Sequence, residues 1–242
     1  EAQSKIGPKA AARSMARFAE HQELAERNGE RLLKNPDIAL TAMTRQQSTF
    51  THQDLARFVN RHTVNKEQFE AVYEKVKTDQ NLVHLGRDDR GRDRFTTRDM
   101  LALETQMINQ VKLCTQTIHH SVADKYIHDA MLNKNLSEEQ QAAFKHLTQS
   151  GDIACVVGFA GTGKSYMLGA AREAWIAAGY HVQGMTLSGI AAENLESGSG
   201  IESHTVARQL WYWERGRERL TNKDIVVIDE AGMLGSRQMA KI

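Results

Sequence analysis

Apolar positions follow a helical spacing in the first part of the chain. Between residues 2 and 40 they recur loosely every three or four positions among Ala, Glu, Arg and Gln, which predicts a helical connector. Two capping-box patterns, Thr51–Asp54 and Asn65–Gln68, each precede an apolar run at helical spacing and predict two short successive helices. The first part of the chain is therefore predicted to be mainly helical.

A hairpin is predicted after these helices. Leu82–Gly86 and Asp93–Thr96 flank the charged residues 87–92, as expected for two strands joined by a polar tip. Helix, helix and hairpin with a basic tip is the order of a winged-helix module, whose helix and wing contact nucleic acid. A small domain that only packs against its neighbour is an equally open alternative. Thr96–Asp99 then predicts the start of a long helix that extends at most to Leu132.

The remainder of the chain alternates apolar runs with helical segments, which is typical of a parallel α/β sheet. Because strands of such a sheet are buried on both faces, they read as continuous apolar runs. Strands are predicted over Ile153–Val157, His181–Thr186 and Ile225–Ile228, with helices from Lys164 and from about Ile190. The predicted domains are a helical connector (1–48), a helical and hairpin domain with the long helix (49–132), and a sheet domain (133–242).

Composition narrows the class of protein without deciding it. The chain has 242 residues, of which 40% are hydrophobic and 25% charged, enough for two modest domains. It has neither a long uncharged apolar run nor the pattern of a secretory signal, so a cytoplasmic protein without a membrane span is expected. A net charge of +1 is uninformative about nucleic acid, because a local basic stripe can still bind phosphates. The first residue is Glu1 rather than Met, so we expect a piece of a longer protein.

Gly158–Ser165 matches the phosphate-binding loop G-x-x-x-x-G-K-[ST]. It follows the predicted strand Ile153–Val157 and opens a predicted helix, which is the context that this loop requires. Main-chain N–H groups would hold the phosphates, Lys164 would reach the β and γ phosphates, and Ser165 would ligate Mg²⁺. A glycine-rich turn that binds nothing is the alternative. The predicted ATP-binding residues of the loop are Gly158, Ala160, Gly161, Thr162, Gly163, Lys164 and Ser165.

Two acidic residues end the apolar run Ile225–Ile228. A buried parallel strand delivers such residues to the carboxyl edge of the sheet, where ligands bind. Asp229 is predicted to hold Mg²⁺ through water, and Glu230 to orient and deprotonate the water that attacks the γ-phosphate. An acidic turn after a core strand is the alternative, but its pairing with the phosphate loop favours catalysis. Adjacent Asp and Glu favour an ATPase over a kinase.

Gln140 lies upstream of the phosphate loop, in a third capping pattern that starts at Ser137. Capping alone would explain this glutamine. Its position also suits an amide that recognises adenine by a pair of hydrogen bonds, which is the interpretation that we favour. Gln141 is the fallback for the same role.

Small hydroxyl and glycine residues occur where further strands become helices. At such places free main-chain N–H groups can contact the phosphates of a nucleic-acid strand. The aromatic run Trp211–Trp213 could stack on bases, although core packing and a surface patch together are the favoured explanation. The candidate DNA contacts are Thr186, Ser188, Gly189, His204 and Thr205.

Taken in order, these motifs resemble the early motifs of superfamily 1 helicases of the RecD branch. The set comprises Leu136–Ala143, Gly158–Ser165, Thr186–Ala192, Ser203–Leu210 and Val227–Leu234. The helicase portion of TraA-type relaxases of Ti-like conjugative plasmids is especially similar, because Thr49–Glu104 also looks like the region between relaxase and motor in that family.

The resemblance implies a RecA-like P-loop NTPase fold, here truncated. It also implies ATP and Mg²⁺ as cofactors and 5′ to 3′ movement on single-stranded DNA. A relaxase domain and a second RecA-like domain, which supplies a charge-stabilising arginine, are expected elsewhere in the parent chain. Without that arginine we expect weak nucleotide binding and slow hydrolysis. A DNA-binding or docking module without turnover and another P-loop ATPase are the alternatives.

Overall fold

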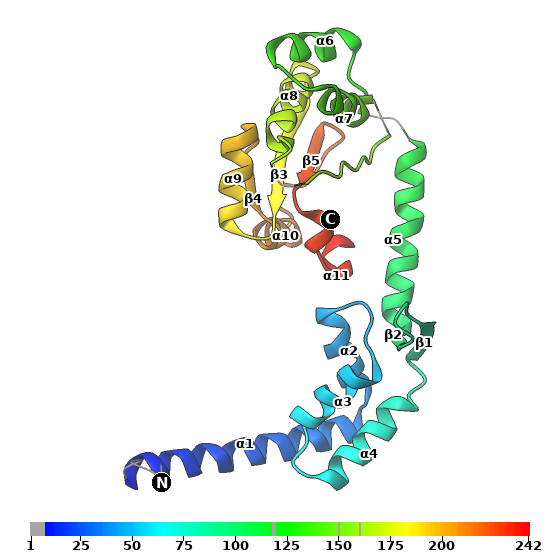
Figure 1. Ribbon diagram of the computed structural model, residues 1–242, viewed down its shortest axis with the longest axis vertical. Coiled ribbons are helices and arrows are strands. Elements are labelled where there is room, and N and C mark those ends of the chain that lie inside the picture. Colours follow the sequence, from blue (N-terminus) through cyan, green and yellow to red (C-terminus); the bar gives the residue numbers. More distant parts are fainter. Residues whose placement is uncertain (1–7, 118–119, 150, 160) are drawn as a thin grey trace. The chain divides into compact units, whose positions relative to one another are not determined.

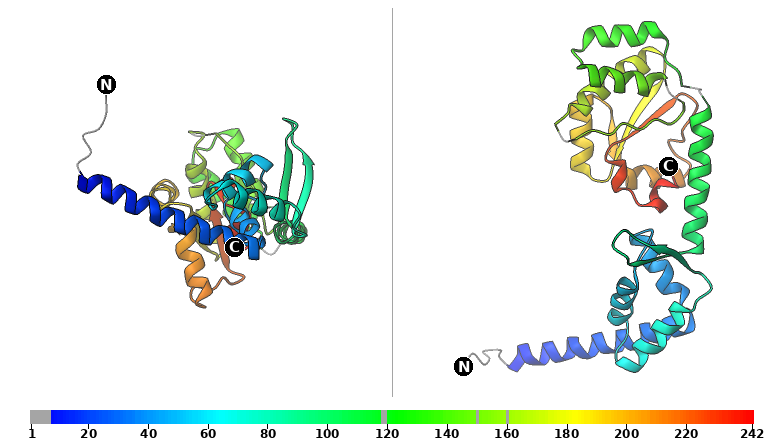
Figure 2. Two further views of the ribbon diagram at one scale, coloured as in Figure 1. Left: turned by 90° about the horizontal axis from the view of Figure 1, so that it is seen from below. Right: turned by 45° about the vertical axis from the view of Figure 1, so that its right-hand side comes forward.

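The computed structural model describes residues 8–117, 120–149, 151–159 and 161–242. They form two compact units (Figures 1 and 2). The first comprises the residues up to Glu104 together with Gly235–Arg237, and the second comprises Thr105–Leu234 and Gln238–Ile242. Among the described residues, no helix is both long and apolar enough to cross a membrane.

The first unit is mainly helical and has one hairpin, as predicted. Its core contains Leu55 and Val59 of α3 together with Val72 and Val76 of α4. Residues of the preceding helices complete this core. The elements are α1 (Pro8–Lys34), α2 (Asp37–Gln46), α3 (His52–Arg61), α4 (Lys66–Lys77), β1 (Leu82–Arg87), β2 (Asp93–Thr97) and the beginning of α5 (Arg98–Gln116).

The two capping patterns fold differently from one another. The Thr51 hydroxyl accepts from the Asp54 N–H at 3.2 Å and the Asp54 carboxylate accepts from the Thr51 N–H at 2.9 Å, so the first capping box is confirmed. Asn65 accepts from the Gln68 N–H at 2.8 Å, but the Gln68 side chain accepts from the N–H of Val64 instead of returning to Asn65. The second pattern is therefore a simple N-cap.

Strands β1 and β2 pair in an antiparallel register that joins Leu82 to Thr97 and Arg87 to Asp93. This confirms the predicted hairpin and its charged tip. The helix that follows begins as expected, with the Thr97 hydroxyl accepting from the N–H of Met100 at 3.1 Å. The extension to Leu132 was wrong, because α5 ends at Gln116 and a separate helix starts at Asp124. Helical spacing alone does not report such an interruption.

The second unit is an α/β domain with a parallel sheet, so the predicted fold class is confirmed. The sheet has three strands in the order β4-β3-β5. Pairing joins Gly184 to Ser203 on one side of β3 and Gly184 to Val227 on the other. The elements after α5 are α6 (Asp124–Asn133), α7 (Glu138–Gln149), α8 (Lys164–Ala177), β3 (His181–Thr186), α9 (Gly189–Ser199), β4 (Ser203–Thr205), α10 (Val206–Glu214), β5 (Asp224–Ile228), the 3-10 helix η1 (Ala231–Met233) and α11 (Ser236–Met239).

Strand β5 is apolar throughout because its side chains pack on both faces of the sheet. Ile225 and Val227 pack against the core that α6, α7 and α8 cover. Val226 and Ile228 pack against a second cluster built around Met185 of β3 and residues of α10. A strand with cores on both faces needs apolar side chains at successive positions, as its sequence shows.

The prediction of a strand over Ile153–Val157 was wrong, because this segment is not part of the sheet. Val156 packs against the α6–α8 core, while Val157 is 99% exposed. A strand requires hydrogen bonds to a neighbouring strand. Among the described residues β5 pairs only with β3, so the segment makes no ladder with the free edge of β5.

Candidate nucleotide and nucleic-acid site

The phosphate loop immediately precedes α8, as its sequence requires. Gly161 and Gly163 have φ values of +79° and +75°, a left-handed conformation that glycine adopts without strain. Gly163 is the N-cap of α8, so the positive end of the helix opens at Lys164. Ala160, predicted to belong to the loop, lies outside the described residues.

The Lys164 ammonium folds back onto the loop. Its Nζ donates to the carbonyl oxygens of Gly158 at 2.8 Å and Phe159 at 2.9 Å. The Thr162 hydroxyl donates to the same Phe159 oxygen at 2.9 Å. Neutral carbonyls hold the cation here, and among the described residues no carboxylate forms an ion pair with it. Its charge is therefore available to an anion.

Gln140 joins the capping box of α7 to the phosphate loop. Its Oε1 accepts from the N–H of Ser137 at 3.0 Å, and its own N–H donates to the Ser137 hydroxyl at 3.3 Å. Its Nε2 donates to the carbonyl of Thr162 at 2.9 Å. The neighbouring Gln141 instead donates to the carbonyl of Leu136 at 2.9 Å. Of the two candidate glutamines, Gln140 is the one placed at the loop.

Ser165 lies where α8 and α9 approach closely. A Cβ placed on Gly198 would lie 2.8 Å from the Ser165 Cβ, so only glycine fits opposite this serine. One turn later, a Cβ on Gly169 would lie 3.3 Å from the carbonyl oxygen of Ser199. This packing fixes the first turn of α8 against α9. The sequence carried no signal for it beyond two glycines at unremarkable positions.

The acidic pair follows β5 at the carboxyl edge of the sheet. The Asp229 N–H donates to the carbonyl of Met185 at 3.1 Å, which extends the pairing of β5 with β3. Glu230 is exposed and has a φ of +52°, a left-handed conformation that is costly for a residue with a side chain. Its N–H donates to the Asp229 carboxylate at 3.0 Å. Such strain often occurs at functional positions.

The candidate DNA contacts gather at the same edge. Thr186 and Thr205 are paired neighbours at the ends of β3 and β4, and His204 pairs with Met185. Ser188 caps α9 by accepting from the N–H of Ala191, at 3.2 Å. Thr205 caps α10 in the same way, and Gly189 is the first residue of α9. Strand β4 was missed from sequence because three residues are too few to show a period.

The aromatic residues of α10 are engaged within the protein. Trp213 packs against the cluster around Met185, and its Nε1 donates to the carbonyl of Glu218 at 2.8 Å. The Arg215 guanidinium lies 3.9 Å from the ring centroid of Trp211. Trp213 therefore packs against the core, whereas Trp211 is 45% exposed, so the run serves both the core and the surface.

Comparison with known proteins agrees with the sequence and the fold. Residues 135–242 match a family described as AAA domain. The chain is 38% identical over 248 residues to conjugal transfer protein TraA of Rhizobium radiobacter, which covers 97% of this chain and 22% of the relative. It is 35% identical over 235 residues to a probable conjugal transfer protein TraA of Sinorhizobium fredii, covering 94% and 21%. For TraA of Agrobacterium fabrum the identity is 36% over 234 residues, covering 93% and 21%.

The chain thus spans about a fifth of the length of the curated relatives that it matches. The resemblance inferred from the motifs is confirmed by these relatives. Over nearly its whole length, the chain is homologous to one segment of the TraA conjugal transfer proteins, with a P-loop AAA domain at residues 135–242.

Proposed function

We propose that this chain is the ATP-binding part of a DNA helicase that moves 5′ to 3′ on single-stranded DNA during conjugative plasmid transfer. One observation carries the proposal. The carboxyl edge of the sheet brings Thr205, Thr186 and Asp229 together on three adjacent parallel strands. Open α/β sheets bind ligands at this edge, so the nucleotide and the nucleic acid would bind at the ends of neighbouring β-strands.

The phosphate loop fits a nucleoside triphosphate. Among the described residues, Lys164 is held by neutral carbonyls alone, so it can turn to the β and γ phosphates. The main-chain N–H groups at the start of α8 would hold the phosphates, and the Ser165 hydroxyl and Asp229 would hold Mg²⁺. Mg²⁺ bound there would neutralise charge on the phosphates. The second N–H and the second lone pair of the Gln140 amide remain for adenine.

Glu230 is the residue that we assign to activation of water. It follows Asp229 directly and is exposed, so its carboxylate can accept a proton from water. Its left-handed conformation turns the chain sharply after β5. Asp229 would orient this turn through its bond to the Glu230 N–H.

The DNA strand would run across the ends of β3 and β4. The helices α9 and α10 both begin at this edge, so their N-terminal N–H groups are available to phosphates. Ser188, Gly189, His204 and Thr205 are the contacts that we assign. Thr186 is only 1% exposed and its hydroxyl donates to the carbonyl of Ser188, so it would position the start of α9 instead of touching the strand. These contacts are to the backbone of the strand and carry no sequence preference.

The complete activity would belong to a longer protein in the cytoplasm. We expect a relaxase domain and a second RecA-like domain there, the second supplying an arginine to the transition state. Such an arginine accelerates hydrolysis by about 10³- to 10⁵-fold in related enzymes. This chain by itself is therefore expected to bind nucleotide weakly and turn it over slowly.

Binding of a fluorescent ATP analogue with Mg²⁺ tests the nucleotide site. Lys164→Ala should abolish binding, because the cation that meets the phosphates is removed. Lys145→Ala, which removes an exposed lysine from α7, is the matched control and should bind as the unaltered chain does. Equal binding by both variants would rule out the assigned loop.

Turnover with single-stranded DNA tests the coupling between the two sites. Addition of single-stranded DNA should change the rate of ATP hydrolysis. His204→Ala should weaken that response while nucleotide binding is retained. His204 is the best probe because, unlike Ser188 and Thr205, it caps no helix. Hydrolysis that ignores DNA in every variant would favour another kind of P-loop ATPase.

A further inference from the structure

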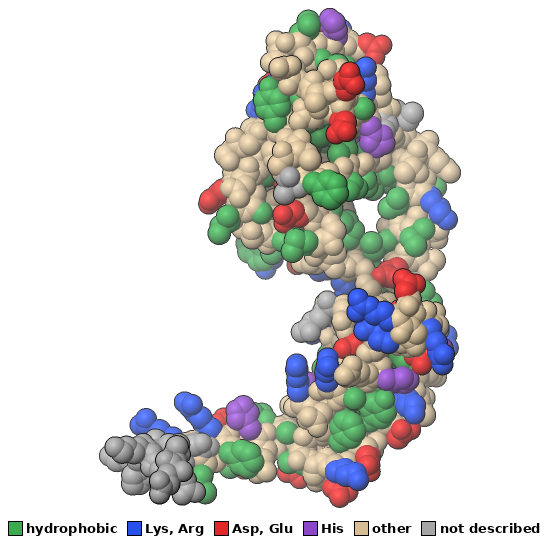
Figure 3. Space-filling view, in the orientation of Figure 1, with side chains coloured by type: hydrophobic (Ala, Val, Ile, Leu, Met, Phe, Trp, Pro, Cys, Tyr) green, Lys and Arg blue, Asp and Glu red, His purple; other side chains and the backbone are tan. Residues whose placement is uncertain are grey.

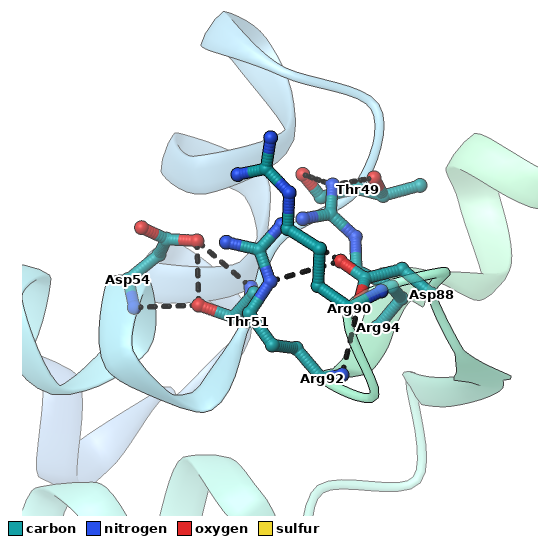
Figure 4. A network of polar contacts seen from close by, with 7 residues as sticks. All are labelled: Thr49, Thr51, Asp54, Asp88, Arg90, Arg92 and Arg94. Atoms are coloured by element: carbon teal, nitrogen blue, oxygen red, sulfur yellow. Dashed lines mark hydrogen bonds and ion pairs between the residues drawn. The ribbon is translucent and has the colours of Figure 1, made fainter.

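Arginines of the hairpin gather beside the start of α3 in the first unit. Figure 4 shows Arg90, Arg92 and Arg94 from the hairpin alongside Thr51 and Asp54 of the α3 capping box. The Arg94 guanidinium donates to the hydroxyl and to the carbonyl of Thr49, which ties the hairpin to the chain that leads into α3. The space-filling view shows Lys and Arg side chains gathered over this part of the first unit (Figure 3).

Asp88 shapes the tip of the hairpin. Its Oδ1 accepts from the N–H groups of Arg90 and Arg92, each at 3.0 Å. Its Oδ2 accepts from Nε and Nη2 of Arg92 at 2.9 and 2.8 Å. Gly91 provides the left-handed residue of the turn, with a φ of +72°. The tip is therefore a defined structure, and it fixes the positions from which its arginines project.

Acidic groups of this region are mostly engaged within it, whereas several arginines are not. Asp88 is bound to Arg92, and Asp93 accepts from His84 at 2.9 Å and lies 3.6 Å from Arg87. Arg57 and Arg61 of α3 and Arg90 of the hairpin tip are exposed, and none of the three forms an ion pair among the described residues.

Arg57 and Arg61 are four residues apart and so lie on one side of α3. Burial acts to raise the pKa of the Asp54 carboxyl, but hydrogen bonds from Thr51 lower it, and the nearby charges of Arg57 and Arg94 lower it further. Asp54 therefore lies close to an arginine of α3 and to an arginine of the hairpin, so the two groups of arginines are near one another. We call Arg57, Arg61, Arg90, Arg92 and Arg94 the arginine surface.

In the part of the chain that the structure describes, the arginine surface has no aromatic platform for unstacked bases. The rings of Phe50 and Phe95 are buried in the core of the unit, and Phe58, Phe69 and Tyr73 pack against that core. Proteins that bind single strands usually stack bases on exposed aromatic rings. A surface of guanidinium groups alone fits the phosphates of a duplex, whose bases are already stacked.

We propose that the arginine surface binds the phosphate backbone of duplex DNA, as a second DNA site in addition to the strand site at the sheet edge. Arg57, Arg61 and Arg90 contact phosphates directly. Arg92 and Arg94 support them by holding the hairpin tip and its base. The proposal does not depend on nucleotide binding, because every residue involved belongs to the first unit.

Fluorescence anisotropy of a labelled duplex, measured without nucleotide at several salt concentrations, tests this proposal on the full chain. Arg57→Ala with Arg90→Ala should weaken binding by about tenfold or more and reduce the salt slope by about 2, roughly 0.9 per lost phosphate contact. The matched control is Arg17→Ala with Arg27→Ala, which removes the same charge from exposed positions of α1. The control should retain the affinity and the slope.

A variant with the opposite expected sign strengthens the test. Asp89 is an exposed acid at the hairpin tip. Asp89→Asn removes a charge that repels phosphate, so it should tighten duplex binding. Thermal unfolding should be unchanged in all these variants, since the altered side chains are exposed.

Three outcomes would overturn the proposal. One is equal affinity and slope in the two double variants, which would mean that only total charge matters. Another is a single strand of the same length bound as tightly as the duplex and lost in the same variant. The third is unchanged or weaker binding by Asp89→Asn. ATP-analogue binding, measured in parallel, reports on the nucleotide site separately.

Discussion

The side-chain amide of Gln140 donates a hydrogen bond of 2.9 Å to the main-chain carbonyl of Thr162. The same amide nitrogen would lie 2.5 Å from a Cβ placed on Gly163. A residue at the start of α7 thereby lies directly against the phosphate loop. Any shift of α7 would reach the loop through this contact.

Gln140→Glu separates the two roles of this residue. The glutamate keeps an oxygen that can accept from Ser137, so the free energy of unfolding should change little. It loses the N–H that reaches Thr162, so the affinity for an ATP analogue should fall. Gln140→Ala should lose both, with about 1 kcal/mol of stability removed. Denaturant unfolding and analogue titration measure the two effects.

Gln141→Ala is the matched control, since that side chain bonds to Leu136 instead of the loop. If Gln141→Ala lowered nucleotide affinity and Gln140→Glu did not, the assignment of Gln140 would be wrong.

Glu230→Gly should stabilise the chain and stop hydrolysis. Glycine adopts the observed φ of +52° without the cost that a side chain imposes, about 1 kcal/mol. Glu230→Gln keeps the cost of the left-handed backbone and removes only the carboxylate that serves as the base. It should therefore stop hydrolysis and leave the free energy of unfolding unchanged. Thermal unfolding and single-turnover hydrolysis distinguish these variants. Full turnover in Glu230→Gln would exclude this residue as the base.

Gly198→Ala should displace Ser165 and weaken nucleotide binding that depends on Mg²⁺. The new Cβ would lie 2.8 Å from the Ser165 Cβ, which is too close, so α8 and α9 must separate. Ser197→Ala changes an exposed neighbour in the same helix and should have little effect. The measurement is analogue affinity with and without Mg²⁺. A normal Mg²⁺ response in Gly198→Ala would contradict the proposed role of Ser165.

Asp88 should make the hairpin sensitive to acid. Hydrogen bonds from the Arg92 side chain and from main-chain N–H groups lower its pKa from 3.8 to about 2. Because the pKa is lower in the folded protein, this stabilisation is complete above pH 3.8 and is lost as the pH falls towards 2. Asp88→Asn should remove that part of the pH dependence. NMR titration of the Asp88 carboxyl measures it, and a midpoint near 3.8 would refute the contact.

Much of the candidate site could be predicted from sequence because its signals are local. The phosphate loop, the acidic pair after β5 and the α3 capping box each depend on a few residues at fixed spacing. The same holds for the hairpin, whose strands are adjacent in the chain. Helix ends were less predictable, since the break after Gln116 interrupts a spacing that remains apolar on both sides.

By itself, the sequence determined which residue types are present for phosphate, metal and water, and in which local elements they lie. Only the tertiary structure decided which of them meet. The pairing of Thr186 with Thr205 and the contact of Gln140 with Thr162 join residues far apart in the chain. The tertiary structure also leaves Ile153–Val157 outside the sheet, because an apolar run becomes a strand only when a neighbouring strand pairs with its main-chain N–H and C=O groups. Such partners are chosen by long-range packing, which no local pattern encodes.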